Sequence, residues 1–361
     1  MNLLLAPHQD MLCASAEKIA AALTGVPHEA QIRAAVRQAG LLDLLVPEQL
    51  EGAGLGTADL LLVLRAFARR MVPATFASTM IAQPLLTRTD APDIQAHRAR
   101  RLSGSCSLAL AIDGDADGFD LGGSIPVVDD RQDIARLTGA HRFVPDCDSA
   151  DAFLVLARYG SDLALLWLDK GADGVSVQPQ RQADGSCVGH LHFADTPVAP
   201  AALIARGAFV EASVSLARGR LLLASAAELL GTAETALALA LDHVRLREQF
   251  GRKIGSFQAL QHRLVDAHVG LELLTSLIFR AATDLDRGML HPATLHACKA
   301  KAGTAALEAI RTALQVHGAI GYTAAHDLNR LFRRAQTLEA RFGNSAMHQS
   351  AFSKLTWAQA S

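Results

Sequence analysis

The spacing of apolar side chains changes twice along the chain. Up to about residue 100 the spacing is helical: in Thr57–Met71, the side chains of Leu60, Leu64 and Phe67 recur on one face, as in an amphipathic helix. A connection rich in glycine and proline, Leu42–Gly56, interrupts this region and predicts a turn between helices.

From about Cys106 the apolar runs become shorter. Ala152–Arg158 and Leu163–Asp169 are separated by Tyr-Gly-Ser-Asp, which predicts a β-hairpin. Two further runs, at 174–178 and 188–193, are bounded by turn residues and predict more strands. This middle region is about 100 residues long, the usual size of an independent core.

Helical spacing returns after residue 207 and persists to the end. The predicted helices are Phe209–Phe250, Phe257–Arg287, Pro292–His317 and Asp327–Trp357. Long helices with short connections imply an antiparallel four-helix bundle. The predicted fold class is therefore α+β and multi-domain: an N-terminal helical domain (1–105), a middle β-barrel-like domain (106–206) and a C-terminal helical bundle (207–361).

Composition removes several classes of function. Half the residues are hydrophobic, 19% are charged and the formal net charge is −2, and Lys and Arg do not cluster, so neither nucleic acid nor an anionic membrane surface is expected as a partner. No apolar window reaches the length of a membrane span, and the first residues do not resemble a signal peptide. Five scattered cysteines without a CxxC pair predict a reduced, cytoplasmic setting and no thiol metal site.

One short segment combines a cation, an aromatic side chain and glycine. Residues 247–258 read Arg-Glu-Gln-Phe-Gly-Arg-Lys-Ile-Gly-Ser-Phe-Gln. The guanidinium of Arg247 offers paired donors that match phosphate oxygens, and Gly251 interrupts a long helical pattern beside it. The alternative for this segment alone is a helix end with a basic last turn and a glycine cap.

A second segment ends a predicted helix in glycines. Residues 315–322 read Gln-Val-His-Gly-Ala-Ile-Gly-Tyr. Backbone amides in such a turn form an anion cradle, while the alternative is a Schellman-type helix cap. A third segment, Gly40–Gly54, carries Val-Pro-Glu followed by two spaced glycines and predicts a structural turn that docks helices on the β domain.

Together these segments resemble the signatures of the acyl-CoA dehydrogenase family, R-x-Q-F-G-x-x-I-x-x-F-Q, Q-x-x-G-G-x-G-Y and G-L-x-x-x-x-V-P-E-x-x-G-G-x-G. The resemblance implies FAD, with Arg247 at its pyrophosphate and Phe250 on the flavin of a neighbouring subunit. It also implies an acyl-CoA thioester substrate, an electron-transfer partner and a dimer or tetramer, homo- or hetero-oligomeric. The cofactor-binding positions it implies are Arg247, Gln249, Phe250, Gly251, Gln258, Gln315, Gly318, Ala319, Phe143 and Asn344.

The middle region departs from the family pattern. The usual T-E-P-x-x-G-S-D is scarcely retained near Leu108–Asp115, and the W-I-T strand that lines the flavin reads Phe143-Val144-Pro145. Phe143 can still stack on a ring system, but Pro145 offers neither the hydroxyl nor the N–H of a threonine. A purely structural strand is the alternative.

The catalytic base is the larger departure. Most members carry a Glu in Y-E-G-T on the last helical segment, where this chain has Phe342, followed by Gly343 and Asn344; a minority use an earlier helix, where it has Gly219. The family reaction removes a proton beside a thioester while hydride leaves the adjacent carbon, so it needs a positioned carboxylate. Neither position supplies one.

Three explanations remain open. The chain is the base-less subunit of a pair, as in the short, unequal subunits of some steroid-side-chain acyl-CoA dehydrogenases. Alternatively Glu339, three residues before Phe342, lies on nearly the same helix face and acts as a displaced base. The third explanation is a subunit that binds FAD or a CoA ester without dehydrogenating it.

Other candidate sites are weaker. His190 and His192 are two residues apart and would lie on the same face of a strand, but no third ligand is near in sequence. The glycines of Gly118–Gly123 lack the strand and helix of a dinucleotide-binding motif. No metal site is expected.

Overall fold

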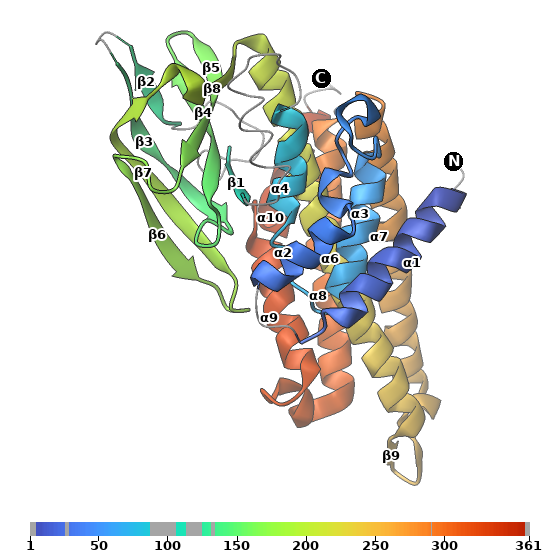
Figure 1. The fold of residues 1–361 in the computed structure, drawn as a ribbon. Coiled ribbons are helices and arrows are strands. Elements are labelled where there is room, and N and C mark those ends of the chain that lie inside the picture. Colours follow the sequence, from blue (N-terminus) through green and yellow to red (C-terminus); the bar gives the residue numbers. More distant parts are fainter. Residues whose placement is uncertain are drawn as a thin grey trace. The chain divides into compact units, whose positions relative to one another are not determined.

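A computed structural model describes residues 5–25, 29–86, 106–112, 125–130, 134–289 and 291–357 (Figure 1). Helices come first, strands follow and long helices end the chain, which confirms the predicted fold class. The chain forms two compact units, one of residues 1–26, 57–74 and 222–361, the other of residues 27–56 and 75–221. The three domain boundaries expected from the sequence stay a prediction. The glycine-rich stretch 118–123 and Asp113–Asp115 lie outside the described residues.

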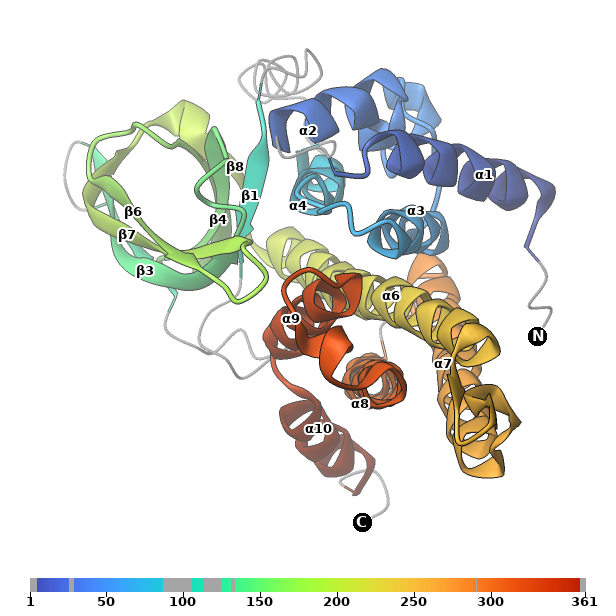
Figure 2. The ribbon, with the colours of Figure 1, turned by 90° about the horizontal axis from the view of Figure 1, so that it is seen from below.

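The second unit contains an eight-stranded sheet in the order β6-β7-β3-β2-β4-β5-β8, with β1 beside β4. Pairing is antiparallel except that β1 and β2 each run parallel to β4. Seen from below, the sheet curls around an apolar interior that includes Leu137, Phe153, Leu166 and Leu191 (Figure 2). The strands are β1 (Leu108–Ala111), β2 (Val127–Asp129), β3 (Ala135–Pro145), β4 (Ala152–Tyr159), β5 (Asp162–Asp169), β6 (Val175–Arg181), β7 (Cys187–Val198) and β8 (Leu203–Arg206).

The predicted hairpin is confirmed by β4 and β5, which pair from Ala152 with Asp169 to Tyr159 with Asp162. Every residue of β4 from Ala152 to Ala157 is buried, which explains why its sequence is a continuous apolar run without alternation. The run at 188–193 is confirmed as part of β7, and the run at 174–178 as part of β6, which begins one residue later at Val175.

Two short helices, α2 (Glu29–Gln38) and α4 (Ala77–Ala82), also belong to this unit. The hydroxyl of Thr79 on α4 accepts a hydrogen bond from the amide of Leu108 at 3.1 Å and donates to its carbonyl at 3.2 Å, which docks α4 on β1. In the Gly40–Gly54 turn, the amide of Gly54 donates to the carbonyl of Val46 at 2.8 Å. The turn is stabilised by its own backbone, as a structural role requires.

The first unit is helical. α8 lies at its centre, packed against α7, α9 and α10, and its many buried alanines allow close approach of the neighbouring helices. Pro292 occupies the first turn of α8, where its missing N–H costs no hydrogen bond. The helices are α1 (Pro7–Ala22), α3 (Thr57–Arg69), α6 (Ala208–Leu246, of which residues 222–246 belong to this unit), α7 (Gln258–Asp286), α8 (Pro292–His317), α9 (Asp327–Ala340) and α10 (Ser345–Trp357).

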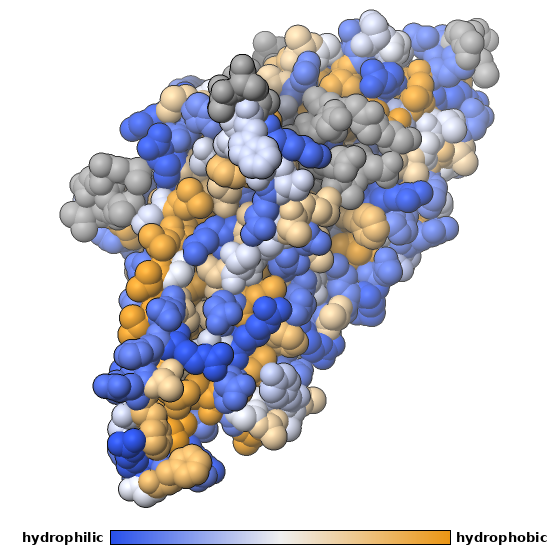
Figure 3. Space-filling view, turned by 180° about the vertical axis from the view of Figure 1, so that it is seen from behind, coloured by the Kyte–Doolittle hydropathy of each residue, from blue (hydrophilic) through white to orange (hydrophobic). Residues whose placement is uncertain are grey.

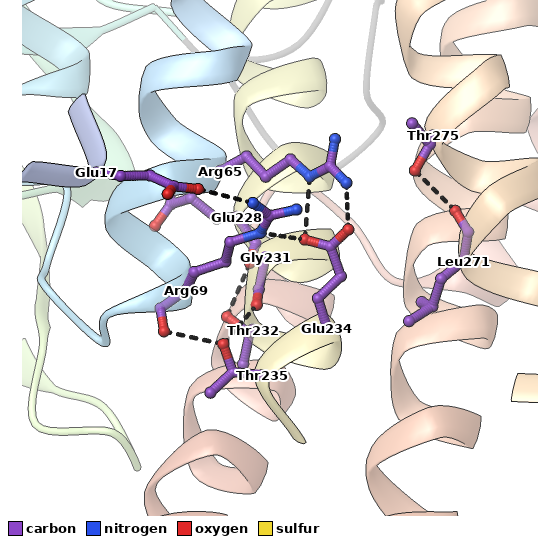
Figure 4. Close-up of polar contacts among 10 residues, drawn as sticks. All are labelled: Glu17, Arg65, Arg69, Glu228, Gly231, Thr232, Glu234, Thr235, Leu271 and Thr275. Carbon is purple, nitrogen blue, oxygen red and sulfur yellow. Dashed lines mark hydrogen bonds and ion pairs between the residues drawn. The ribbon is translucent and has the colours of Figure 1, made fainter. Parts of the chain in front are cut away.

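A polar cluster joins α1, α3 and α6 (Figure 4). Arg65 and Arg69 on α3 both donate to the carboxylate of Glu234 on α6, Arg69 at 2.7 Å, and Arg69 also donates to Glu17 on α1 at 2.9 Å. Burial alone would raise the pKa of Glu234, but the two arginine contacts hold it below its usual value. A Cβ at Gly231 would lie 2.5 Å from the carbonyl oxygen of Arg65, so the absence of a side chain there lets α3 and α6 approach closely.

Helix α6 is long and apolar enough to cross a membrane by length and composition, but 83% of that apolar window is buried inside the protein. Such burial is typical of a core helix in a globular protein. No other helix in the described part of the chain passes the same test.

Candidate functional site

The first motif forms a small hairpin at the end of α6. The helix ends at Leu246, four residues before the predicted end, and β9 (Glu248–Gln249) pairs antiparallel with β10 (Arg252–Lys253). The two residues of the turn, Phe250 and Gly251, both have positive φ, 57° and 77°. Positive φ at both central residues is the mark of a type I′ turn, which favours Asn-Gly. The glycine therefore belongs to a hairpin and does not cap the helix.

Phe250 is the anomaly in this hairpin. A bulky residue with positive φ is strained, and strain of this kind, about 1–3 kcal/mol, is concentrated at functional sites. The Phe250 side chain is 91% exposed, and its ring meets the edge of Phe257 at a centroid distance of 6.1 Å. Local packing does not account for a strained, exposed aromatic residue, so the position indicates contact with a ligand or a second chain.

The second motif forms the turn after α8. Gly318 has φ 68° and ψ −149°, a combination outside the left-handed helical region of a Schellman cap and open essentially to glycine alone. The chain continues as a short 3-10 helix, η6 (Gly318–Tyr322). A Cβ built on Gly318 meets no atom within 4 Å, so the backbone of this turn faces open space and an anion can approach it.

The fold brings the two motifs together. The amide of Arg247 donates to the carbonyl of His243 at 2.9 Å, and the imidazole of His243 stacks on that of His317, the last residue of α8, at 4.2 Å. The candidate cofactor residues of both motifs are exposed, whereas neighbours such as Ile254 and Leu314 are buried. The exposed residues are Arg247, Gln249, Phe250, Gly251, Gln258, Gln315, Gly318 and Ala319.

Charge and shape fit a phosphate at this end of the bundle. Within the described ranges, no carboxylate pairs with Arg247, while the nearby Arg245 lies 3.5 Å from Asp242. An unpaired guanidinium beside an open glycine turn is the donor set expected for a diphosphate. The residues present therefore fit the diphosphate of FAD, although their role in binding it stays a prediction.

Phe143 lies in the other unit, on β3. The pairing of β3 with β7 shifts between His141 and Val144, and Phe143, at this bulge, has φ 54°. Its side chain is 59% exposed and meets the ring of His190 edge-on at 5.1 Å. Bulges re-aim side chains near binding sites, and the strained, exposed ring is available for stacking.

The prediction of one helix over Asp327–Trp357 is wrong, because the structure has two helices there. α9 ends at Ala340, α10 begins at Ser345, and Phe342 and Gly343 between them have φ 60° and 97°. The expectation that Glu339 shares a helix face with Phe342 therefore fails, because Phe342 is not helical. The carboxylate of Glu339 instead accepts a hydrogen bond from the amide of Ser345 at 2.7 Å.

A buried lysine holds this turn. Lys299 on α8 is 1% exposed, and its Nζ donates to the carbonyls of Leu338, Glu339 and Gly343 at 3.0, 2.8 and 3.1 Å. Three carbonyls match the three N–H bonds of an ammonium group. They include carbonyls at the end of α9, where the helix dipole favours a cation. Burial lowers the pKa of Lys299 to about 7.

Two histidines complete the network. His348 on α10 contacts the carbonyl of Phe342 through Nε2 at 2.9 Å, and its Nδ1 lies 2.7 Å from Nδ1 of His296. Because His348 donates from Nε2, its neutral Nδ1 must accept, and His296 is the donor of the pair. Burial lowers the pKa of His348 to about 4, so the pair is neutral near pH 7. Asn344 accepts from the amide of Met347 at 2.9 Å and is the N-cap of α10.

The two regions lie at opposite ends of α8. Lys299 and His317 are 18 residues apart on this helix, or about 27 Å at 1.5 Å per residue. Within one chain, the Phe342 turn and the Arg247 hairpin therefore cannot contact the same group of atoms.

Lys299 and His348 are site residues that the sequence patterns did not identify. A signal existed for Lys299, a lone charge on the apolar stripe of α8 that includes Leu295, Cys298 and Ala302. Nothing in the sequence indicates that His348 is buried. As for metals, no group of three His, Cys, Asp or Glu side chains among the described residues could hold an ion. His190 and His192 therefore have no third ligand in this part of the chain.

Known proteins with similar sequences and folds identify the class. Residues 209–354 match the acyl-CoA dehydrogenase C-terminal domain. The acyl-CoA dehydrogenase FadE27 of Mycobacterium tuberculosis is 32% identical over 320 residues, which cover 85% of this chain and 83% of that protein. The acyl-CoA dehydrogenase IpdE2 of the same organism is 30% identical over 304 residues, which cover 82% of this chain and 77% of that protein.

Among solved structures, the ChsE4-ChsE5 complex of Mycobacterium tuberculosis contains a chain that superposes with a TM-score of 0.84. It is 26% identical, and the match covers 98% of both chains. The present chain belongs to the acyl-CoA dehydrogenase family, and a protein crystallised as a two-component complex is among its structural relatives.

Proposed function

We propose that the protein is an FAD-dependent oxidoreductase that desaturates an acyl-CoA thioester between its α and β carbons, together with a partner subunit that supplies the catalytic base. The observation that carries this proposal is the pair of exposed motifs at one end of the bundle. They combine the unpaired guanidinium of Arg247, the strained Phe250 and the open turn at Gly318. All three features are explained by a bound dinucleotide.

When bound, FAD would accept the hydride from the β carbon. This chain's contribution is to fix the cofactor. Arg247 would hold the diphosphate, the amides after Gly318 would donate to it, and Phe250 would cover an aromatic ring. An electron-transfer protein as acceptor is part of the same proposal, because FAD must be reoxidised after each turnover. We also propose a cytoplasmic location.

Assembly through the C-terminal helices is supported by exposed apolar surface. Val265, Val269 and Leu273 follow one another at four-residue intervals on α7, and they are 57%, 49% and 57% exposed. A cavity of about 800 Å³ between α6 and the start of α7 adjoins the first of them, Val265, and is also lined by Leu241, Val244 and Leu264. Apolar side chains interrupt the polar surface on the face drawn in Figure 3. Such a continuous apolar stripe is typical of a subunit interface.

The side chain at residue 342 supports the need for a partner subunit. The turn there presents a phenylalanine in place of a carboxylate, and the nearby Glu339 is engaged in capping α10, which weakens its case as a displaced base. A second candidate function follows from the same observation: a subunit that binds FAD or a CoA ester without catalysis. Activity of the purified pair separates the two candidates.

The proposal is tested by flavin content. We expect the purified protein to carry FAD, identified by its absorbance and its release on denaturation. Arg247→Ala removes a charge-assisted contact worth roughly 1.5–3 kcal/mol, so FAD should bind about 10- to 150-fold more weakly. Arg245→Ala is the matched control, because Arg245 lies on the same helix end and faces Asp242. Equal FAD affinity in wild type and Arg247→Ala would refute the assignment.

A further inference from the structure

Three histidines converge beside the proposed diphosphate site. His243 lies near the end of α6, His317 is the last residue of α8, and His326 is the N-cap residue of α9. The His243 and His317 rings stack at 4.2 Å with 29° between their planes, and His326 meets His317 edge-on at 4.9 Å. Three chain segments thus place imidazoles in one row.

The hydrogen bonds define which nitrogen can take a proton. Nδ1 of His317 donates to the carbonyl of Ala313 at 2.8 Å, so its Nε2 is the free acceptor. Nδ1 of His326 accepts from the amide of Leu328 at 3.1 Å, so protonation there would break the cap of α9. In the described part of the chain, no hydrogen bond occupies the ring of His243. His243 and His317 are therefore the members of the row that can gain charge.

The surroundings keep this pair neutral in the absence of a ligand. Burial lowers the pKa of His243, and His317, Arg247 and His326 lower it further. Burial likewise lowers the pKa of His317; the hydrogen bond to Ala313 opposes this shift, and His326 adds to it. The carboxylates closest in sequence face other partners, since Asp242 faces Arg245 at 3.5 Å and Asp327 faces Arg330 at 3.3 Å. A bound anion would reverse this balance.

We propose that His243 and His317 form a proton-gated anion contact, which takes up a proton when the diphosphate of an adenosine diphosphate group binds beside Arg247. The position supports this role. Arg247 follows His243 by one turn, and the glycine turn begins immediately after His317. The inference rests on the proposed function, in which this group belongs to FAD. CoA carries the same chemistry and is the second possible source.

The inference predicts affinity that depends on pH. If one proton is taken up on binding, affinity rises as pH falls, by at most tenfold per pH unit. We expect FAD to bind the full-length protein about 3- to 10-fold more tightly at pH 6 than at pH 8. Calorimetry in two buffers of different ionisation enthalpy should count up to one proton absorbed per FAD.

The decisive variant is His243→Phe combined with His317→Phe, which keeps two stacked aromatic rings but removes both titratable nitrogens. It should still bind FAD, with the pH dependence lost and no proton uptake. His291→Phe, an exposed histidine at the opposite end of α8, should behave as wild type. A pH-independent wild type, or a double variant that keeps the wild-type pH dependence, would overturn the inference.

Parallel titrations with CoA identify the source of the anion. Proton-linked binding of FAD alone supports the flavin site. Proton-linked binding of CoA alone would keep the histidine contact but refute the flavin assignment. FAD binding without proton uptake would refute the histidine contact and leave the proposed function intact. Binding of neither would refute both.

Discussion

The two ends of α8 differ in how many of their polar and aromatic groups find partners within the same chain. At the Lys299 end, the ammonium group accounts for three carbonyls, His348 contacts a fourth, and Glu339 and Asn344 accept from two amides at the start of α10. At the His317 end, Arg247 has no carboxylate partner among the described residues, the strained Phe250 is exposed apart from an edge contact with Phe257, and the glycine turn is open. The groups of the first region are largely paired within the chain. The exposed groups of the second region are suited to contact a ligand or another subunit. A ligand or a second subunit should therefore affect the His317 end most directly.

The largest expected effect tests whether a carboxylate at the Phe342 turn is enough to supply the catalytic base. In the flavin-loaded protein purified without its partner subunit, Phe342→Glu should raise the rate of acyl-CoA dehydrogenation by about 10²- to 10⁴-fold, the usual contribution of a positioned general base. The turn should keep its shape, because it is held by backbone carbonyls. The measurement is the rate of flavin bleaching under anaerobic conditions with a series of acyl-CoA thioesters.

Glu339→Gln is the control for a displaced base. It should leave the activity of the Phe342→Glu protein largely unchanged, because Glu339 caps α10 and does not share a helix face with Phe342. If Glu339→Gln abolishes activity of the wild-type chain purified without a partner, Glu339 is the base and the paired-subunit proposal is wrong.

The next effect concerns the neutral histidine pair. His348 has a pKa of about 4 in the folded protein against 6.5 for an ordinary histidine. The unfolded chain therefore binds more protons between these values, and the stability contributed above pH 6.5 is lost as pH falls towards 4. Between pH 6.5 and 5 this loss should reach about 2 kcal/mol. Denaturant unfolding at the two pH values measures it.

His348→Gln should remove that part of the acid sensitivity, since an amide can still donate to the Phe342 carbonyl but does not titrate in this range. His262→Gln, an exposed histidine on α7, is the matched control and should retain the wild-type loss. Equal acid sensitivity of His348→Gln and wild type would show that this histidine is not kept neutral by the fold.

The smallest effect concerns the Phe250 hairpin at the His317 end of α8. Asn-Gly is the preferred pair for a type I′ turn, so Phe250→Asn should relieve strain and raise the free energy of unfolding by about 1 kcal/mol. The same change should weaken FAD binding and subunit association, measured by flavin absorbance and light scattering. Glu51→Asn is the control, because Glu51 also has positive φ, 64°, but lies far from the motif in sequence and should change stability alone.

Sequence patterns predicted elements whose determinants are local. α8 has the predicted bounds, and the β4–β5 hairpin differs by one residue at each side of its turn, because periodicity, Pro292 and Gly160 specify them within a few residues. The two segments that resemble family signatures could be recognised for a similar reason, because each is one continuous run of sequence; their role in binding FAD stays a prediction.

The errors have non-local causes. The break between α9 and α10 was missed because the group that stabilises it, the ammonium of Lys299, is about 40 residues earlier in the chain. The early end of α6 at Leu246 was missed because the pairing of β9 with β10 competes with continued helix only once the hairpin closes. The convergence of His243, His317 and His326 depends on three segments meeting, which no single stretch of sequence reveals.

The way Lys299 holds its turn also bears on how the family diversifies. Lys299 contacts main-chain carbonyls, and His348 contacts the carbonyl of Phe342, so these hydrogen bonds do not depend on which side chain stands at position 342. Substitution should therefore be tolerated better at Phe342 than at Gly303 and Gly343, where an added Cβ would meet neighbours, or at Lys299, whose three hydrogen bonds hold the turn. On the proposed function, a single substitution at position 342 would decide whether the chain depends on a partner for its base, while the hydrogen bonds that hold the turn would stay the same.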